Sequence, residues 1–215
     1  MVKMFHQMCF NLHTPRQQNP AILGGEVHNI EACAGNKLLL AWHDFVECQL
    51  LLFFDDQSAA ERSLESQLAK VSPGYYARMI ETFHRGVCLY VAARRTKSRK
   101  YKRQAKKIRK VLRKWNKVGN PNVAYYCIFL DAEHAALKGQ YEEAENQYLK
   151  AIQFAARSGF LHHAALFNEL YSDFLFRQRG DREEAKYRLE QAIRYYEDWG
   201  AFGKVELLYE SNLLK

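Results

Sequence analysis

Histidine and cysteine are the side chains through which this chain could bind a transition metal. The sequence contains eight histidines and five cysteines. A helical zinc site places two histidines four residues apart on one face, and no histidine pair in this sequence has that spacing. His162 and His163 are adjacent and would point to different helix faces, whereas His84 and Cys88, four residues apart, could share one metal. Two ligands do not make a structural site, so the sequence predicts no metal and no cofactor.

Nucleophilic catalysis would need a serine or cysteine that its surroundings activate. The sequence has no GxSxG turn that would present a serine. The cysteines are widely spaced and stand in apolar stretches, where we expect reduced thiols packed as small hydrophobes: Cys9, Cys33, Cys48, Cys88 and Cys127. Neighbouring carboxylates are better explained as charges at helix starts: Asp55-Asp56, Glu142-Glu143 and Glu183-Glu184. We therefore expect that the chain is not an enzyme, unless another polypeptide completes an active site.

The strongest chemical signal is a run of positive charge. Residues 94–117 contain 14 lysines and arginines and no acidic residue. The whole chain carries a formal charge of +8, so the remaining residues, with 18 basic and 24 acidic side chains, have a net charge of −6. Phosphates are anions that such a segment could bind, with an affinity that falls as the salt concentration rises.

Apolar residues recur at helical spacing within this segment. Five of them, alternately four and three residues apart, form a stripe that we expect to face the protein: Tyr101, Ala105, Ile108, Leu112 and Trp115. Five cations would then face water: Arg99, Arg103, Lys106, Lys110 and Arg113. This basic face either pairs with acidic residues elsewhere in the chain or binds an anionic partner such as a nucleic acid. Reading of bases is disfavoured, because both aromatic rings belong to the inward stripe.

Two further roles of the basic segment follow from its sequence. Thr96 and Ser98 follow Arg94 and Arg95, which is the pattern of a basophilic kinase substrate, and phosphorylation would partly neutralise the face. The cluster could also act as a nuclear localisation signal. Otherwise we expect a cytoplasmic protein, because no apolar run reaches the roughly 20 residues of a membrane span. The N-terminal 13 residues are too interrupted for a secretory signal.

Helices must position these residues, because the second half of the chain contains a helical repeat. Residues 139–152 and 180–193 align at an offset of 41 residues. Glycines recur about every 20 residues, at Gly119, Gly139, Gly159, Gly180 and Gly200. This interval is the length of one helix and its turn, and glycine commonly terminates helices. The chain has only 11 glycines and 4 prolines, which argues against a turn-rich β fold.

The repeat and the apolar periodicity predict an all-α fold. A short helix is expected at 26–34 after a loop at 13–25, and residues 1–34 form a lead-in segment. Residues 35–215 form the repeat domain. Its helix pairs are expected at 37–54/58–70, 75–95/98–117, 121–138/141–158 and 160–179/182–199, with a last helix at 202–213. Ser72-Pro73-Gly74 precedes the second pair.

The repeat resembles the tetratricopeptide motif. Residues 139–152, GQYEEAENQYLKAI, match the small and aromatic positions of that motif, and residues 180–193 match except that Arg182 replaces an aromatic. The positions of the motif's Leu-Gly pair hold Asp131-Ala132 and Ser172-Asp173, and the period of 41 exceeds the usual length of about 34. The resemblance implies a right-handed α-solenoid of about four hairpins with a C-terminal capping helix.

A second resemblance covers nearly the whole chain. Its segments are GNPN (119–122), DAEHAALKG (131–139), AARSGFLHHAALFNEL (155–170) and YYEDWGAFGKVELL (195–208). They resemble the helical-repeat region of large predicted-ATPase signalling proteins, in which a kinase-like domain and a P-loop ATPase precede the repeats. The ending WGA-x-x-KV, Trp199 to Val205, is the most specific piece. This chain has no GxxxxGK[ST], so no nucleotide site is carried over. Its start suggests a fragment or a member that kept only the repeats.

The tetratricopeptide resemblance also implies a concave wall that binds a protein or a peptide. Six residues would face it: Tyr126, Phe129, Glu133, Leu170, Phe174 and Arg177. The aromatic rings among them could equally be core. The sequence thus predicts a non-enzymatic protein-interaction or regulatory module in signalling, and alternatively a nucleic-acid- or phosphate-binding adaptor that uses residues 94–117. It does not specify the partner or the oligomeric state.

Overall fold

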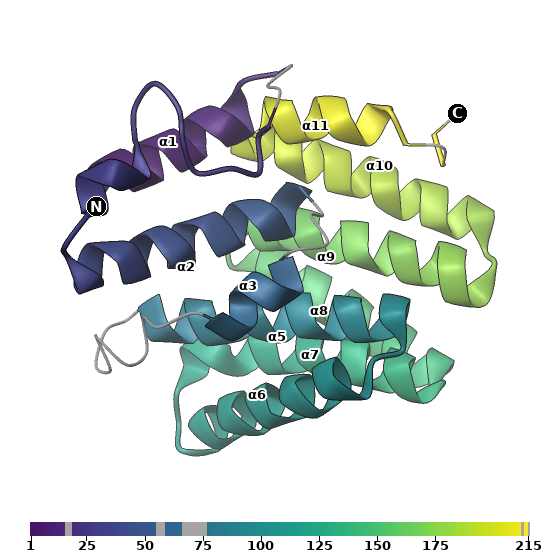
Figure 1. The fold of residues 1–215 in the computed structure, drawn as a ribbon. Coiled ribbons are helices and arrows are strands. Elements are labelled where there is room, and N and C mark those ends of the chain that lie inside the picture. Colours follow the sequence, from purple (N-terminus) through teal and green to yellow (C-terminus); the bar gives the residue numbers. More distant parts are fainter. Residues whose placement is uncertain (16–18, 55–58, 66–76, 212, 215) are drawn as a thin grey trace. The chain divides into compact units, whose positions relative to one another are not determined.

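The computed structural model describes residues 1–15, 19–54, 59–65, 77–211 and 213–214, and every regular element in them is a helix (Figure 1). The all-α prediction is therefore confirmed for these residues. The chain forms two compact units, Met1–Ile108 and Arg109–Lys215. The division falls within helix α6, Arg99–Lys117. The expected boundary between residues 34 and 35 remains a prediction about domain organisation.

Helix α2, Lys37–Phe54, is the centre of the first unit. It packs against α1 (Val2–His13), the 3₁₀ turn η1 (Ile30–Cys33), α3 (Ala59–Glu65) and α5 (Ala77–Thr96). Contact with four elements explains why two thirds of α2 is buried, including Val46 and Leu50 at 0% exposure. The polar side chains of α2 therefore stand in largely apolar surroundings, where they need specific partners.

Helix α1 is not anticipated by the sequence, which has no N-terminal capping residue there. Its buried apolar residues Met4, Met8 and Leu12 repeat every four positions, and Phe5 meets Trp42 of α2 with ring centroids 6.2 Å apart. Burial of this face stabilises the helix in the absence of a cap. Conversely, the helix expected at 26–34 is only the single turn η1, and the last helix ends at Tyr209 rather than 213.

Two amides of α1 hold the loop that follows it. Gln7 Oε1 accepts hydrogen bonds from the backbone N–H groups of Val27 (2.9 Å) and His28 (3.1 Å). Gln7 Nε2 donates to Asn11 Oδ1 (2.8 Å), and Asn11 Nδ2 donates to two loop carbonyls, at 2.8 and 3.0 Å. Gly25 is required here, because its φ is +155° and a Cβ would lie 2.9 Å from Gln7 Nε2. The network fixes the position of His28.

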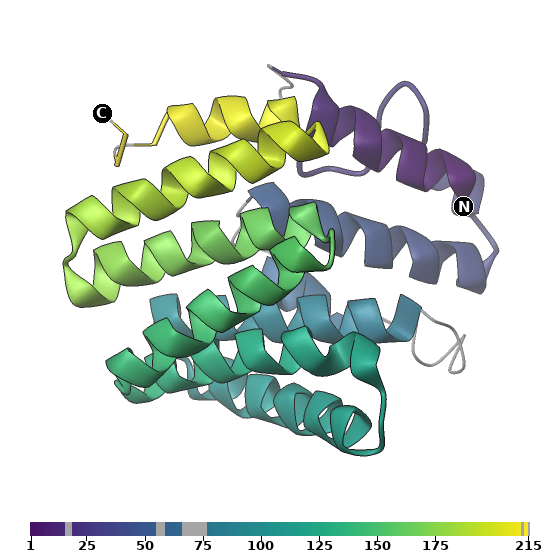
Figure 2. The same cartoon turned by 180° about the vertical axis from the view of Figure 1, so that it is seen from behind.

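The second unit contains helices that pack on their neighbours in chain order (Figure 2). They are α7 (Ala124–Lys138), preceded by the turn η2 (Pro121–Val123), α8 (Tyr141–Arg157), α9 (Leu161–Phe174), which continues as the π-helical turn η3 (Leu175–Arg179), α10 (Arg182–Trp199) and α11 (Phe202–Tyr209). Four alanines that match between the two repeat copies have no exposed surface, which lets the helices approach closely: Ala144, Ala151, Ala185 and Ala192.

Glycines end three of these helices, as the sequence predicts. Gly139, Gly180 and Gly200 are C-caps with φ of +76°, +68° and +84°, a backbone conformation that glycine adopts without strain. The helix expected at 58–70 is described only from Ala59 to Glu65. The rest of it, Asp55-Asp56 and Ser72-Pro73-Gly74 lie outside the described residues. No described helix combines the length and the apolarity that a membrane crossing requires.

Candidate functional site

The outer face of α6 carries a continuous line of positive charge. Six exposed cations recur at alternating intervals of three and four residues, which places them on one side of the helix, and we call them the cationic stripe: Lys100, Arg103, Lys107, Lys110, Lys114 and Lys117. At 1.5 Å per residue the stripe is about 25 Å long. Because it lies on a single helix, its spacing follows from helix geometry alone.

The opposite face of α6 is the predicted inward stripe. Ala105 and Leu112 have no exposed surface, and Tyr101, Ile108 and Trp115 are half-buried. Among the five cations predicted to face water, Lys106 is half-buried and the others are exposed: Arg99, Arg103, Lys110 and Arg113. The sequence therefore predicted the orientation of α6 correctly, and the two aromatic rings are on the inward side.

Some charges of α6 are paired with acidic residues. Arg109 Nε donates to Asp131 Oδ1 of α7, and Arg113 Nη2 lies 2.6 Å from Asp131 Oδ2. In the first unit, Tyr101 donates its hydroxyl proton to Glu61 Oε1 (3.3 Å), and burial together with the Glu61 charge raises the pKa of Tyr101. Arg109 and Arg113 thus fit the alternative in which the basic segment pairs with acidic residues of the same chain. Both lie on the flank of the helix.

The cationic stripe has no such compensation. Within the part of the chain that the structure describes, none of its six side chains forms an ion pair with a carboxylate. Like charges three and four residues apart on a helix repel one another. An anionic partner would remove this repulsion, so the stripe is an exposed surface that favours a negatively charged ligand.

Thr96 is the last residue of α5, and Ser98 directly precedes α6. Thr96 is exposed, and its hydroxyl donates to the Ala92 carbonyl (2.7 Å). The half-buried Ser98 side chain accepts a long hydrogen bond from the Tyr101 N–H (3.5 Å). A phosphate on Ser98 would lie near a helix N-terminus, where negative charge is favourable. Modification of either hydroxyl remains a prediction.

The predicted concave wall lies in the core of the second unit. Phe129 stacks on Phe167 with centroids 4.0 Å apart, Glu133 accepts a hydrogen bond from the Tyr148 hydroxyl (2.7 Å), and Phe174 lies 5.4 Å from the Tyr148 ring. Tyr126 and Leu170 are also buried.

The prediction that these five side chains form an exposed binding wall is therefore wrong. Aromatic side chains gain more from burial between hairpins than from exposure, so the core alternative holds. Arg177 is exposed, and it pairs with Asp173 at 2.6 Å. Of the six residues that the sequence assigns to the wall, only Arg177 is exposed, and its charge is paired within the chain.

The histidines and cysteines considered first are mostly core residues. His84 and Cys88 are both buried, and no third ligand gathers with them in the described ranges. Burial raises the pKa of the Cys127 thiol to about 11, which keeps it protonated and unreactive. Desolvation lowers the pKa of His162 to about 4. Cys9 is exposed, contrary to the expectation that all five thiols are packed inside.

Sequence reasoning missed a group of side chains on α2 whose atoms could bind a metal ion. His43, Asp44 and Glu47 each offer a ligand atom, and these atoms lie within 4.8 Å of one another. The ring of His28 lies 5.4 Å from that of His43 between centroids. The available signal was the pattern HDxxE inside a largely apolar helix, because Glu47 follows His43 by four residues and Asp44 by three, and both spacings bring side chains together on a helix.

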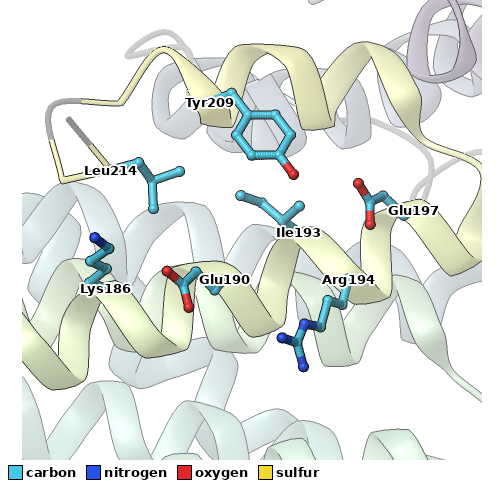
Figure 3. Close-up of a pocket in the computed structure, with 7 residues that line it drawn as sticks. All are labelled: Lys186, Glu190, Ile193, Arg194, Glu197, Tyr209 and Leu214. Carbon is cyan, nitrogen blue, oxygen red and sulfur yellow. The ribbon is translucent and has the colours of Figure 1, made fainter.

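A surface hollow lies between α10 and α11, and Figure 3 shows seven residues that line it. Its charges are balanced, because Lys186 and Arg194 oppose Glu190 and Glu197. Tyr209, Ile193 and Leu214 supply apolar surface. Because these charges cancel, we expect the hollow to attract a charged ligand less strongly than the cationic stripe does.

Comparison of the chain with models of protein families, with curated proteins and with solved structures found no match.

Proposed function

We propose that this chain is a non-enzymatic adaptor that binds the phosphate backbone of a nucleic acid through the cationic stripe of α6. The observation that carries the proposal is the set of six exposed cations without an acidic partner in the described residues. The alternative surface, the concave wall, is buried. The stripe therefore replaces the wall as the binding surface.

The length of the stripe suits a polyanion rather than a single phosphate. A double helix carries one charge per roughly 1.7 Å of its axis, so about 25 Å of duplex presents more than enough phosphates for six cations. Binding would be independent of base sequence, because Tyr101 and Trp115 are half-buried on the inward face and cannot stack on bases. The expected ligand is thus any nucleic acid with an accessible backbone.

The helices are proposed to form a right-handed α-solenoid of about four tetratricopeptide-like hairpins, with α11 as its cap. Packing in chain order and glycine C-caps support this architecture for the second unit. In such an array each repeat contacts only its neighbours. The array would serve as a scaffold that presents α6.

Membership of the repeat region of predicted-ATPase signalling proteins is also a proposal. The pieces that carry the resemblance have structural roles here: Trp199 ends α10, Gly200 is its C-cap, and Lys204 is buried against Glu169. These residues support a connection between α10 and α11 like that of the repeat region, and they imply no activity. Under this proposal the chain regulates a signalling partner, and immunoblotting of source cells for the native polypeptide tests whether it is about 25 kDa or part of a larger protein.

Binding can be tested by fluorescence anisotropy with a labelled 20-base-pair duplex and a labelled single strand of mixed sequence. The test variant is Lys107→Gln/Lys110→Gln/Lys114→Gln, in the middle of the stripe. The matched control, Lys138→Gln/Lys150→Gln/Lys186→Gln, removes the same charge from exposed positions outside α6. We expect the stripe variant to lose at least tenfold in affinity at low salt and the control to lose less than threefold.

Two results would contradict the proposal. One is the absence of any complex with either nucleic acid at low salt. The other is an equal loss of affinity in the stripe variant and its control, which would indicate attraction by net charge without a defined surface. Helical content of each variant, measured by circular dichroism, should equal that of the parent chain, because all six substituted side chains are exposed.

A further inference from the structure

The polar cluster on α2 is unexpected in its surroundings. The helix buries twelve of its eighteen residues, yet it carries His43, Asp44 and Glu47. His43 is buried and the two carboxylates are half-buried. A buried imidazole such as that of His43 is costly unless it is hydrogen-bonded or bound to an ion. One ligand atom of each of the three residues lies within 4.8 Å of the others.

A second observation concerns the nearby imidazoles. His28 and His43 are 5% and 2% exposed, and their ring centroids are 5.4 Å apart. His28 Nε2 and His43 Nδ1 are both buried without a hydrogen-bond partner in the described part of the chain. Two adjacent imidazoles that each bury an unsatisfied nitrogen are better explained by a ligand that accepts their lone pairs than by apolar packing.

The lead-in segment holds His28 in place. The backbone N–H of His28 donates to Gln7 Oε1 (3.1 Å), and its carbonyl accepts from the Gly25 N–H (2.9 Å). Gln7 is itself fixed by Asn11 at 2.8 Å. Both amides are about 1% exposed. A buried network of this kind orients a side chain before its ligand arrives, as contacts behind metal ligands do.

We propose that His28, His43, Asp44 and Glu47 bind a divalent transition-metal ion, with Zn²⁺ as the reference ion. Two imidazole nitrogens and two carboxylate oxygens are a donor set that Zn²⁺ accepts in tetrahedral geometry. The two carboxylates would balance the charge of the ion. The site lies within the first unit and uses none of the residues of the cationic stripe.

The three ligand atoms on α2 need only small side-chain movements to form the site. The His28 ring, whose centroid lies 5.4 Å from that of His43, would turn toward them to supply the fourth ligand. Metal–ligand distances of about 2.0–2.1 Å in a tetrahedral site place ligand atoms roughly 3.4 Å apart. The separations within 4.8 Å on α2 would therefore contract by about 1.4 Å at most, which side-chain rotation can supply. Calcium and magnesium are disfavoured, because they prefer oxygen ligands alone.

The test uses the full chain after removal of metals with a chelator and dialysis. Isothermal titration with Zn²⁺ should give one equivalent per chain and should raise the thermal midpoint of unfolding. Titration with Co²⁺ should give the visible absorption of a four-coordinate nitrogen and oxygen site without a thiolate charge-transfer band. Glu47→Gln and His28→Gln should each weaken Zn²⁺ binding on the order of 100-fold.

The control addresses the rival pair on α5. His84→Gln/Cys88→Ser should leave the Zn²⁺ affinity and the Co²⁺ spectrum unchanged. Failure to bind one equivalent, unchanged affinity in Glu47→Gln and His28→Gln, a thiolate band, or loss of binding in the His84 and Cys88 variant would each overturn the proposal. If His28→Gln does not fold, Glu47→Gln decides the outcome, because Glu47 is only half-buried and the substitution preserves its shape.

Discussion

A buried ion pair links α9 to α11, and its two partners should respond unequally to mutation. Lys204 Nζ lies 2.7 Å from Glu169 Oε1, and Lys204 is 1% exposed. The Tyr196 hydroxyl donates to Glu169 Oε2 (2.8 Å), and burial together with the Glu169 charge raises the pKa of Tyr196. When Lys204 is replaced, Glu169 keeps the hydrogen bond from the Tyr196 hydroxyl and some contact with water. When Glu169 is replaced, Lys204 loses its carboxylate partner.

Glu169→Gln should therefore cost the second unit about 3–5 kcal/mol in free energy of unfolding, because it leaves a buried ammonium without its counter-charge. Lys204→Met removes the charge and fills similar volume, so it should cost only about 1–2 kcal/mol. Urea unfolding followed by far-ultraviolet circular dichroism measures both values. The larger loss would be a substantial part of the roughly 5–15 kcal/mol that stabilises a typical domain.

The order of the two effects decides whether the reasoning holds. A Lys204→Met variant that is destabilised as much as Glu169→Gln would show that Lys204 is not desolvated as its burial indicates. The double variant Glu169→Gln/Lys204→Met should recover much of the stability that Glu169→Gln loses, because the unpaired charge is gone. A purely additive loss would contradict the account in the same way.

Three more predictions follow from local geometry. Gly25→Ala should destabilise the lead-in segment by about 1–3 kcal/mol in urea unfolding, because its added Cβ would contact Gln7. The control is Gly35→Ala, where φ is +77° but no atom lies within 4 Å of the added Cβ, and it should cost about 1 kcal/mol. Because His162 has a pKa of about 4 when folded and an ordinary value near 6.5 when unfolded, protons favour the unfolded state, and unfolding free energy should fall by about 2 kcal/mol from pH 7 to pH 5; a His162→Gln variant with the same pH dependence would refute this. In the native chain a thiol reagent at pH 8 should modify exposed Cys9 rapidly and Cys127 only after unfolding, and rapid labelling of Cys127 in a Cys9→Ser variant would show that its pKa is not raised.

The sequence predicts best those helices whose first and last residues are set by residues close by in the sequence. Glycines at intervals of about 20 residues adopt a left-handed backbone conformation at helix ends or just beyond them. At the start of α10, Asp181 accepts a hydrogen bond from the Glu184 N–H. These effects act within one turn, so periodicity detects them. Helix α1 has no such cap, and the spacing of Met4, Met8 and Leu12 alone does not reveal that α2 covers this face.

The candidate functional residues were harder to predict, because their exposure depends on which side of a helix is covered. The amphipathic pattern of α6 was strong enough to orient it correctly. By analogy with a shorter repeat, the side of α7 that carries Phe129 was predicted to face a binding partner. In the structure the rings of Phe167 and Tyr148 pack against Phe129 on that side. The histidines His28 and His43 are fifteen residues apart, at no helical spacing, and only the loop fixed by Gln7 brings them together.

Binding of a polyanion by the cationic stripe is tested most directly by the salt dependence of the affinity. Six released counterions give a slope of about −5 for log affinity against log salt with duplex DNA, and about −4 with a single strand. In the variant with Lys107, Lys110 and Lys114 replaced by glutamine, the duplex slope should rise to between about −2 and −3. A slope near zero for the parent chain, or identical slopes for the parent and this variant, would contradict the account.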